Sequence, residues 1–410
     1  MKQLHRRVVV TGLGILSPIG NSVKDAWTSC TNGISGITKI DIGLENSPVT
    51  IGGRLKNFFS NDYLDPKELR RIDPFIQYGI IAANQSIEDS GILNSSTDLN
   101  RVGVNFGAGI GGIETIEKNK SILESKGFKK VSPFFVPGSI VNMISGLVSI
   151  KHGFMGPNTS VVTACSTGNH CIGTAARSVA YGEADVMIAG GAEMASTPLS
   201  IAGFISARAL SLNPSPETAS RPWDIDRDGF VLSDGAGSLV IEEYEHAKNR
   251  SANIYAEIIG FGSSSDAHHM TAPPSDGRGA ALSMCNALAD AQINASDVDY
   301  INAHGTSTPL GDIAETVALK SVFGSSVPQI SSTKSMTGHT LGAAGAIESI
   351  FCIKAINDGV IPPTINLINP DPLCDLNYTP LNATEKDVSV TMNNSFGFGG
   401  TNSTLVFKKI

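Results

Sequence analysis

Short apolar runs bounded by glycine or polar residues alternate along the chain with longer segments of helical periodicity. Such runs are typical of buried strands, and apolar residues repeating every three or four positions are typical of helices. The expected strands are Val8–Val10, Val102–Phe106, Val161–Thr163, Val186–Ala189, Leu239–Glu242, Ile254–Ile259, Tyr300–Ala303, Gln329–Ser331, Val388–Met392 and Thr404–Phe407. The expected helices are Pro74–Ser90, His170–Tyr181, Gly279–Ala291 and Ala343–Ile356. This alternation predicts an α/β protein with buried sheets.

One combination of elements occurs twice. The helical segment Ile87–Ile92 leads through an acidic link to the strand Val102–Phe106 and then to a glycine-rich turn. The segment Leu288–Ile293 leads in the same way to the strand Tyr300–Ala303 and a second turn. A duplicated α/β unit is the simplest interpretation. We expect an N-terminal half at 1–250 and a C-terminal half at 251–410.

Composition and charge restrict the possible functions. Hydrophobic residues make up 41% of the 410 residues and charged residues 17%, as in an ordinary globular protein. The net charge of −8 argues against a nucleic-acid-binding protein, which needs a basic surface. No apolar stretch reaches the roughly 18 residues needed to cross a bilayer, so we expect no membrane insertion. The six cysteines form no C-x-x-C pair and no zinc-type spacing, which predicts reduced thiols in a cytoplasmic protein without a metal site.

The first candidate for chemistry is Cys165. An apolar run ends at this residue, and a helix rich in small residues is expected to follow. The start of a buried helix carries positive potential, which favours a thiolate over a thiol, and small neighbours leave room for a substrate. An arbitrary cysteine is more often a buried structural residue, but the other five cysteines lack this setting. We therefore predict that Cys165 is a nucleophile.

Two histidines lie at expected strand-to-turn junctions. His304 follows the strand Tyr300–Ala303, and His339 follows Lys334 in a segment rich in serine and threonine. Each histidine alone would be an ordinary polar residue, but two in this setting, with a lysine beside one, indicate catalysis. Lys334 is alternatively part of a buried ion pair with Glu348, and the two roles are compatible. The local signatures of cysteine proteases and hydrolases are absent.

Two glycine-rich segments have different interpretations. Asn394–Asn402 contains three glycines before the last expected strand, and backbone amides in such a segment can point at a developing oxyanion. A plain tight turn is the alternative. Gly107–Gly112 fits the dinucleotide-binding pattern G-x-G-x-x-G, but no second strand ending in an acidic residue follows about 20 positions later. We therefore expect no dinucleotide site.

In their order along the chain, these motifs resemble those of one family. The chain is similar to the β-ketoacyl-acyl carrier protein synthases, in particular the type II elongating enzymes of bacterial fatty acid synthesis. The resemblance runs from Val8–Gly14 through Arg221–Asp224 and Asp228–Phe230 to Gly399–Asn402. It implies a thiolase-like fold with a duplicated five-layered α-β-α-β-α arrangement, and a homodimer. Two histidines, rather than a histidine and an asparagine, distinguish this pattern from the initiating synthases.

The resemblance implies a role for each motif. Cys165 would accept the acyl group, with the backbone amides of Cys165 and Phe398 forming the oxyanion hole. His304 and His339 would hold the malonyl thioester carbonyl during loss of CO₂, and Lys334 would tune the two histidines. The resulting enolate would attack the acyl group to form the β-ketoacyl product. No metal or redox cofactor would be needed, because both substrates are carried on the phosphopantetheine of acyl carrier protein.

Further positions match the substrate site and docking surface of the family. The residues expected at the substrate site are Ile110, Phe135, Thr306, Thr308, Phe396 and Glu348. In the family pattern Ile110 would line the acyl pocket, Phe135 would reach across the dimer, and the two threonines would contact the phosphopantetheine arm. Glu348 would support Lys334, and Phe398 would also act as a gate. The basic residues expected to dock an acidic carrier are Lys67, Arg70, Arg71, Lys129, Lys130 and Arg208.

Three alternatives share this fold. A type I elongating synthase has the same residues and chemistry, but Ile110 and its surroundings favour type II. A polyketide ketosynthase is the second alternative. The third is a non-catalytic partner that only shapes the pocket of a synthase, and such a protein would lack the nucleophilic cysteine that this chain has at position 165.

Overall fold

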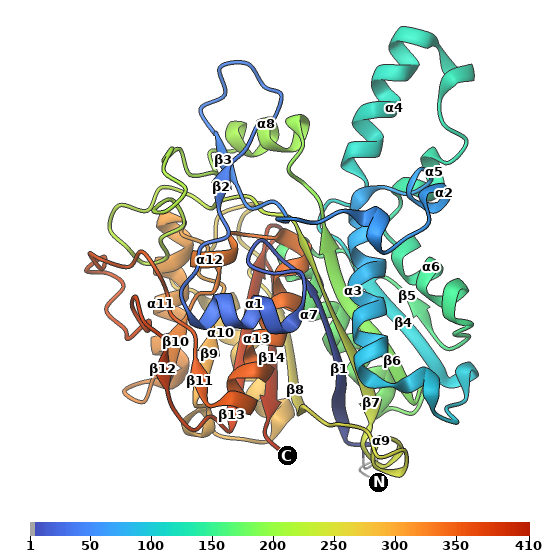
Figure 1. The fold of residues 1–410 in the computed structure, drawn as a ribbon. Coiled ribbons are helices and arrows are strands. Elements are labelled where there is room, and N and C mark those ends of the chain that lie inside the picture. The colour runs from blue at the N-terminus through green and yellow to red at the C-terminus, as the bar shows by residue number, and fades with distance from the viewer. Residues whose placement is uncertain (1–4) are drawn as a thin grey trace.

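The structure is a computed structural model that describes residues 5–410. Its centre is a ten-stranded sheet with the strand order β10-β9-β13-β14-β8-β1-β7-β6-β4-β5 (Figure 1). These strands are β1 (Val8–Leu16), β4 (Val102–Gly107), β5 (Asn158–Thr159), β6 (Val186–Glu193), β7 (Gly235–Glu243), β8 (Ala256–Ser265), β9 (Tyr300–Asn302), β10 (Gln329–Ser331), β13 (Val390–Gly397) and β14 (Thr401–Lys408). Two short pairs lie outside this sheet: β2 (Thr38–Lys39) with β3 (Ile51–Gly52), and β11 (Val360–Ile361) with β12 (Thr384–Glu385).

Helices separate most of the strands along the chain. They are α1 (Val23–Thr31), α2 (Pro66–Leu69), α3 (Pro74–Ser90), α4 (Ile113–Lys126), α5 (Phe135–Ser139), α6 (Met143–His152), α7 (Thr167–Ala180), α8 (Pro198–Ser206), α9 (Tyr244–Asn249), α10 (Arg278–Ala291), α11 (Pro309–Phe323), α12 (Lys334–Thr337) and α13 (Ala344–Asp358). The helix α3 shows why these segments begin and end where they do. Its cap Asp73 accepts the N–H of Phe75, proline occupies the first position, and Gly91 ends it with a φ of +63°. Within residues 5–410, none of these helices is long and apolar enough to cross a membrane.

The sheet consists of two halves with the same topology. The order β1-β7-β6-β4-β5 in one half corresponds to β8-β14-β13-β9-β10 in the other. In both halves the first two pairings are antiparallel and the next two are parallel. A short antiparallel ladder between β1 and β8 joins the halves. The duplication expected from the repeated helix–strand pattern is therefore present in the fold.

Helices form three layers around the two half-sheets. The central layer holds α7 and α13, which contact each other and strands of both halves. On the outside, α3 packs on β1, β7 and β6, while α10 packs on β8 and β14 (Figure 1). Each helical layer has its own apolar core. Ile172 and Phe351 belong to the core of the central layer, Ile81 of α3 to a second core, and Met284 of α10 to a third. The predicted five-layered α-β-α-β-α arrangement is confirmed.

Most of the expected elements are present, and α3 and β10 have the predicted bounds. The strand expected at Val161–Thr163 is wrong, because these residues follow β5 without joining the sheet. The backbone N–H of Thr163 donates instead to Thr167 Oγ1, at 2.9 Å. Val162 is 54% exposed, so this segment lacks the burial that a central strand requires. The chain here forms the irregular approach to Cys165.

Candidate active site

Cys165 lies in a strained turn at the start of α7. The 3₁₀ turn Ala164–Ser166 leads directly into the helix, and Ala164 has a φ of +50°, in the left-handed region. A residue with a Cβ costs roughly 1–2 kcal/mol in this conformation, so surrounding contacts must hold it. Ser166 Oγ donates to backbone carbonyls of β13 and β14, each at 2.8 Å. The strands β13 and β14, which are the last two along the chain, therefore anchor the turn that carries the sulfur.

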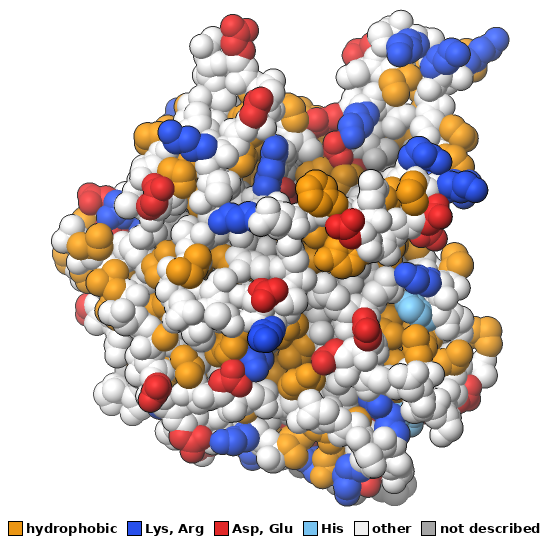
Figure 2. Space-filling model, viewed as in Figure 1, with side chains coloured by type: hydrophobic (Ala, Val, Ile, Leu, Met, Phe, Trp, Pro, Cys, Tyr) orange, Lys and Arg blue, Asp and Glu red, His pale blue; other side chains and the backbone are white. Residues whose placement is uncertain are grey.

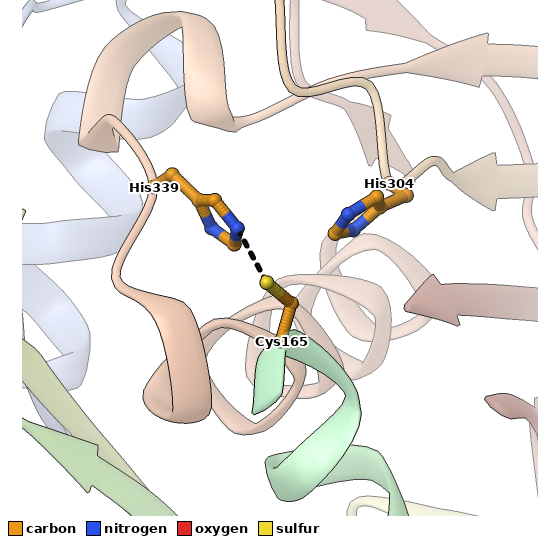
Figure 3. Close-up of side chains that lie close together, drawn as sticks. All are labelled: Cys165, His304 and His339. Atoms are coloured by element: carbon orange, nitrogen blue, oxygen red, sulfur yellow. Dashed lines mark hydrogen bonds between the residues drawn. The ribbon is translucent and has the colours of Figure 1, made fainter. Parts of the chain in front are cut away.

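Two histidines face the Cys165 sulfur (Figure 3). His339 Nε2 lies 3.0 Å from Cys165 Sγ, and the ring centroids of His304 and His339 are 5.4 Å apart. One ring nitrogen from each histidine and the sulfur all lie within 4.8 Å of one another. Cys165 belongs to the first half of the chain and both histidines to the second. The predicted trio is thus assembled only where the two halves of the fold meet.

The same three side chains are soft donors of the kind that zinc accepts. Among the described residues they are the one set of three such groups close enough to hold an ion. The expectation of a site without a metal stays a prediction.

A buried carboxylate fixes the turn that carries His304. The residue follows β9, and its backbone N–H donates to Glu315 Oε1 at 2.9 Å. The next N–H, from Gly305, donates to Glu315 Oε2 at 2.7 Å. Glu315 lies on α11 and is 2% exposed. The position of His304 is therefore set by a helix that follows it in sequence.

The backbone of His339 is held from a different side. Its N–H donates to the carbonyl of Val231 at 2.7 Å, and its own carbonyl accepts the N–H of Ser233 at 3.0 Å. Gly338, which precedes it, has a φ of +65° and so permits the sharp turn after α12. The ring of Phe230 lies edge-on to the imidazole, with 5.1 Å between centroids. These contacts orient His339 toward the sulfur.

Lys334 and Glu348 form a buried ion pair behind the histidines. Their side chains are 1% and 2% exposed, and Lys334 Nζ donates to Glu348 Oε1. Burial raises the pKa of Glu348 to about 7, and Lys334 opposes that rise. The charge of Lys334 also lowers the pKa of both His304 and His339. The ion pair that the sequence allows for Lys334 is present, and its role in tuning the histidines stays a prediction.

Burial controls the protonation of the trio. It raises the pKa of Cys165 to about 12, while Lys334 and the backbone N–H groups of Phe398 and Cys165 act in the opposite direction. Burial and then Lys334 lower the pKa of His304 and His339 well below the usual range. At neutral pH the thiol S–H therefore donates to a neutral imidazole. The expected stabilisation of a thiolate by the helix start is smaller than this effect of burial.

The glycine-rich loop after β13 brings backbone amides to the sulfur. The N–H of Phe398 interacts with Cys165, as does the N–H of Cys165 itself. Gly399 and Gly400 have φ values of +85° and +69°, which residues with a Cβ adopt only with strain. The loop is also tied to its surroundings, because Gly399 N–H donates to the Met270 carbonyl at 2.7 Å. The arrangement suits the predicted oxyanion hole.

A cavity of about 370 Å³ opens above the trio. Predicted residues in its wall are Cys165, His304, His339, Thr306, Thr308, Phe396, Phe398 and Arg208. The hydroxyl oxygens of Thr306 and Thr308 lie 3.0 Å apart, and Phe396 packs edge-on against His304. Two predicted pocket residues lie outside this wall: Ile110 is 39% exposed on the turn after β4, and Phe135 is half-buried in α5. Within one chain the cavity therefore contains only part of the expected substrate site.

The six predicted docking residues fall into two groups. Lys67, Arg70 and Arg71 lie at α2, and Lys129 and Lys130 follow α4. Figure 2 shows basic side chains gathered over this part of the surface. The guanidinium of Arg71 lies 4.9 Å from the ring centroid of Phe134, beside α5. Arg208 instead follows α8 and lines the cavity.

Comparisons with known proteins agree with this geometry. Residues 5–247 match the model of the "Beta-ketoacyl synthase, N-terminal domain" and residues 255–368 that of the "Beta-ketoacyl synthase, C-terminal domain". The chain belongs to the β-ketoacyl synthase family. It is 53% identical to a 3-oxoacyl-acyl-carrier-protein synthase 2 of Vibrio harveyi and 54% identical to one of Coxiella burnetii, over 99% of each chain.

Solved structures place this β-ketoacyl synthase among similar folds. A β-ketoacyl synthase from Burkholderia phymatum superposes with a TM-score of 0.92 at 34% identity, covering 99% of this chain and 100% of that one. A type II PKS ketosynthase, solved in complex with its acyl-carrier protein, gives a TM-score of 0.91 at 36% identity, with the same coverage. The family resemblance and the thiolase-like fold are confirmed.

Two carboxylates of this synthase were not among the predicted site residues. Glu315 holds the His304 turn, and Glu193, at the end of β6, is surrounded by backbone amides near Cys165. An acidic residue among the buried positions of a helix, between Ala314 and Thr316 of α11, is the signal that could have identified Glu315. Glu193 follows the run Val186–Ala192, and an acid at the end of a fully buried strand is a similar signal.

Proposed function

We propose that the chain catalyses the decarboxylative condensation of malonyl-acyl carrier protein with an acyl group held on Cys165, as a β-ketoacyl-acyl carrier protein synthase of fatty acid elongation. The observation that carries this proposal is the contact of 3.0 Å between Cys165 Sγ and His339 Nε2, with His304 facing the same sulfur. Curated relatives named 3-oxoacyl-acyl-carrier-protein synthase 2 support it at 50–54% identity.

Acyl transfer begins with the neutral thiol. As Cys165 Sγ attacks the thioester carbonyl of the acyl carrier, its proton passes to His339 Nε2, which already accepts it as a hydrogen bond. The amides of Cys165 and Phe398 stabilise the oxyanion. Collapse of the tetrahedral intermediate breaks the carrier C–S bond, and the leaving thiolate takes the proton from His339. Cys165 is then a thioester, and the imidazole is neutral again.

Condensation uses the two imidazoles as neutral donors. In the tautomer with its proton on Nε2, each imidazole can donate to the thioester carbonyl of the malonyl group. For His339 this requires the ring proton to move from Nδ1 to Nε2 after acyl transfer, because Nε2 accepts the thiol proton in the first step. Lys334 adds positive potential. When the C–C bond to the carboxylate breaks, CO₂ leaves and its electron pair forms an enolate on that carbonyl oxygen. The enolate carbon attacks the acyl-Cys165 carbonyl, and the C–S bond breaks as the cysteine leaves as a thiolate. That thiolate takes up one proton from water, which restores the neutral thiol. Preorganised donors in a buried site are effective here because negative charge develops on one oxygen.

The substrates enter on a carrier, and the chain uses no bound cofactor in this scheme. Thr306 and Thr308 line the cavity next to His304, where their hydroxyls can contact a phosphopantetheine arm. Arg208 is in the same wall, so a positive charge is available where an acidic carrier protein would dock. The PKS ketosynthase solved with its acyl-carrier protein supports such a partner.

A homodimer would complete the acyl pocket and cover an exposed apolar surface. Large apolar side chains are exposed on and around α4 and α5, including Phe128 at 75% and Val136 at 59%. The strand β5 forms one edge of the sheet in the same region. A second copy that covered this surface would remove both apolar area and an open edge from water. Phe135, on α5, would then lie at the interface as the family pattern implies.

A polyketide ketosynthase is the second candidate, because one of the similar solved structures is named as a type II PKS ketosynthase. Its identity to this chain is 36%, against 50–54% for the 3-oxoacyl-acyl-carrier-protein synthases 2. Identity over the whole length thus favours fatty acid elongation. A non-catalytic partner is disfavoured by the complete Cys–His–His trio.

The test is intact-mass analysis after mixing the protein with a series of acyl carriers of increasing chain length. We expect a mass increase of one acyl group, located on the peptide that contains Cys165, and release of a β-ketoacyl product when malonyl carrier is added. The matched control is Cys285→Ser, which removes an exposed thiol and should leave acylation unchanged. Acylation that disappears in this control, or that maps to another cysteine, would contradict the proposal.

A further inference from the structure

Glu193 is a fully buried carboxylate that the steps above do not use. It ends β6 with 0% exposure and accepts four backbone N–H groups. The donors are Gly109 at 2.5 Å and Ile110, Gly111 and Gly342 at 3.1 Å each. An ionised carboxylate has about four acceptor sites, so this set of donors is close to its full capacity. Four backbone donors on one buried carboxylate indicate that Glu193 holds the backbone segments around it in place.

The four donors come from the two halves of the fold. Gly109–Gly111 form the turn after β4, whereas Gly342 lies in the 3₁₀ turn that precedes α13. The backbones approach so closely that a Cβ added to Gly342 would lie 2.3 Å from Gly109 N. A Cβ added to Gly109 would lie 3.4 Å from the carbonyl oxygen of Ala164. Glu193 therefore closes a contact between the halves directly beside the nucleophile turn.

The reactive side chains are attached to the segments that meet here. Ala164, against which the Gly109 turn packs, immediately precedes Cys165. Leu341, next to Gly342, belongs to the same apolar cluster as Cys165 and lines the cavity below His339. A hydrogen bond of 3.0 Å between sulfur and nitrogen weakens steeply when either group shifts by about 1 Å. The backbone positions that Glu193 fixes thus determine the contact needed for proton transfer.

We propose that Glu193 is a positioning residue for acyl transfer: it holds the Gly109–Gly111 turn against Gly342 and thereby fixes the contact between Cys165 and His339. This inference rests on the proposed function, because it concerns the transfer of an acyl group to the same cysteine. A carboxylate is required, since a glutamine would turn its NH₂ group toward backbone N–H donors and leave some of them unpaired. Burial raises the pKa of Glu193 to about 7 and the four amides oppose that rise, so at pH 8 the ionised form predominates.

The direction of the effect separates positioning from simple electrostatics. The negative charge of Glu193 raises the pKa of Cys165. If charge were its whole influence, Glu193→Gln would make the thiolate more accessible and acylation faster. If Glu193 positions the two turns, the same substitution makes acylation slower. The two explanations therefore predict opposite signs for one measurement.

The experiment follows acylation of Cys165 by an acyl carrier at pH 8 by rapid-quench intact mass, over a range of carrier concentrations. Glu193→Gln should lower the first-order transfer rate at saturating carrier by at least about tenfold and leave the half-saturating concentration unchanged. The matched control is Glu242→Gln. Glu242 is also 0% exposed but lies at the opposite end of the β6–β7 ladder, where it binds Thr11 and Arg250. Its replacement should leave the transfer rate unchanged even if the melting temperature falls.

Each outcome decides the inference. A Glu193→Gln variant that transfers acyl groups at or above the wild-type rate overturns it, and so does an equal loss in Glu242→Gln, which would show a general effect of losing a buried carboxylate. If Glu193→Gln does not fold, Glu193→Asp carries the test, because it keeps the charge but shortens the side chain by one methylene. Slower transfer in that variant supports positioning, and an unchanged rate overturns it. If the wild-type protein is not acylated, the proposed function itself fails, which is a distinguishable result.

Discussion

The two helices of the central layer, α7 and α13, begin with the same backbone. Each follows a 3₁₀ turn, Ala164–Ser166 in one case and Leu341–Ala343 in the other. The first residue of each turn has a left-handed φ, +50° for Ala164 and +46° for Leu341. The second residue differs, because it is Cys165 before α7 and Gly342 before α13. The duplicated fold thus presents two equivalent turns, and one of them carries the reactive group.

The difference between the turns lies in what surrounds them. The side chain of Cys165 points into the cavity and meets His339. At Gly342 there is no space for a side chain, and the backbone N–H donates to Glu193 instead. The second turn supports the first through the buried carboxylate. The two turns have the same backbone conformation, so they place their second residue in the same way. The surrounding side chains and the free space then determine whether that residue can react.

The largest effect is expected when the reactive turn loses its sulfur. Cys165→Ala should reduce condensation by a factor of at least about 10³ and abolish the acyl-enzyme, because no other group in the cavity can form the thioester. Steady-state product formation and intact mass measure both effects. Cys171→Ala, which removes a buried thiol from the same helix, should retain activity within a few-fold. Product formation at the normal rate by Cys165→Ala would mean that the two turns do not differ in the proposed way.

The second test fills the supporting turn. Gly342→Ala adds a Cβ that would lie 2.3 Å from Gly109 N, and relief of that clash must shift backbone. We expect a loss of about 1–3 kcal/mol in unfolding free energy and at least about tenfold slower acylation. Denaturant unfolding and rapid-quench mass measure these quantities. Gly203→Ala in α8 is the control, since nothing lies within 4 Å of its added Cβ. A wild-type acylation rate in Gly342→Ala would show that the Gly342 turn does not position Cys165.

The third test asks whether burial or positive potential has the larger effect on the pKa of Cys165. Because the pKa of Cys165 is about 12, its alkylation by iodoacetamide should rise about tenfold per pH unit from about pH 7 to 10, without a plateau. Lys334→Met removes a positive charge that lowers this pKa, so alkylation at each pH should become about threefold slower or more. Peptide mass mapping reports the modification of Cys165 alone. A plateau below pH 8 would indicate a thiolate and contradict the expected control by burial.

The smallest effect concerns the left-handed residues themselves. Ala164→Gly should stabilise the fold by up to about 1 kcal/mol, because glycine adopts a positive φ without strain. Leu341→Gly relieves similar strain but removes a side chain that is 3% exposed, and it should destabilise by about 2 kcal/mol or more. Thermal and denaturant unfolding distinguish the two signs. Destabilisation by Ala164→Gly would show that its methyl group contributes more than the strain costs.

Local pattern was sufficient for much of the fold. The sequence pattern gave α3 and β10 their observed bounds, and for α3 the capping residue Asp73, Pro74 and Gly91 mark the ends. It failed at Val161–Thr163, where apolar side chains line the irregular approach to the nucleophile. Periodicity reports which residues prefer burial, but within this chain Val161 is only half-buried and Val162 is exposed.

The site shows a similar division. Cys165, His304 and His339 each occur at a junction that glycine, serine and threonine make visible in the sequence. Glu193 and Glu315 were not predicted as site residues. An acid in a buried setting is visible in the sequence, but its partners are backbone amides, which are the same for every residue type and so do not show what the acid binds. That Arg208 lines the cavity, while the basic residues at α2 do not, likewise depends on how distant segments pack.

The sequence by itself determined the α/β class, the repeated unit and the three residues of the trio, because apolar periodicity and local motifs depend on neighbours along the chain. Only the tertiary structure decided that Cys165 lies 3.0 Å from His339, that burial raises the pKa of its thiol, and that Gly342 donates to Glu193. Burial and hydrogen bonding sum over groups from both halves of the chain, and those groups become neighbours only when the two half-sheets close around α7 and α13.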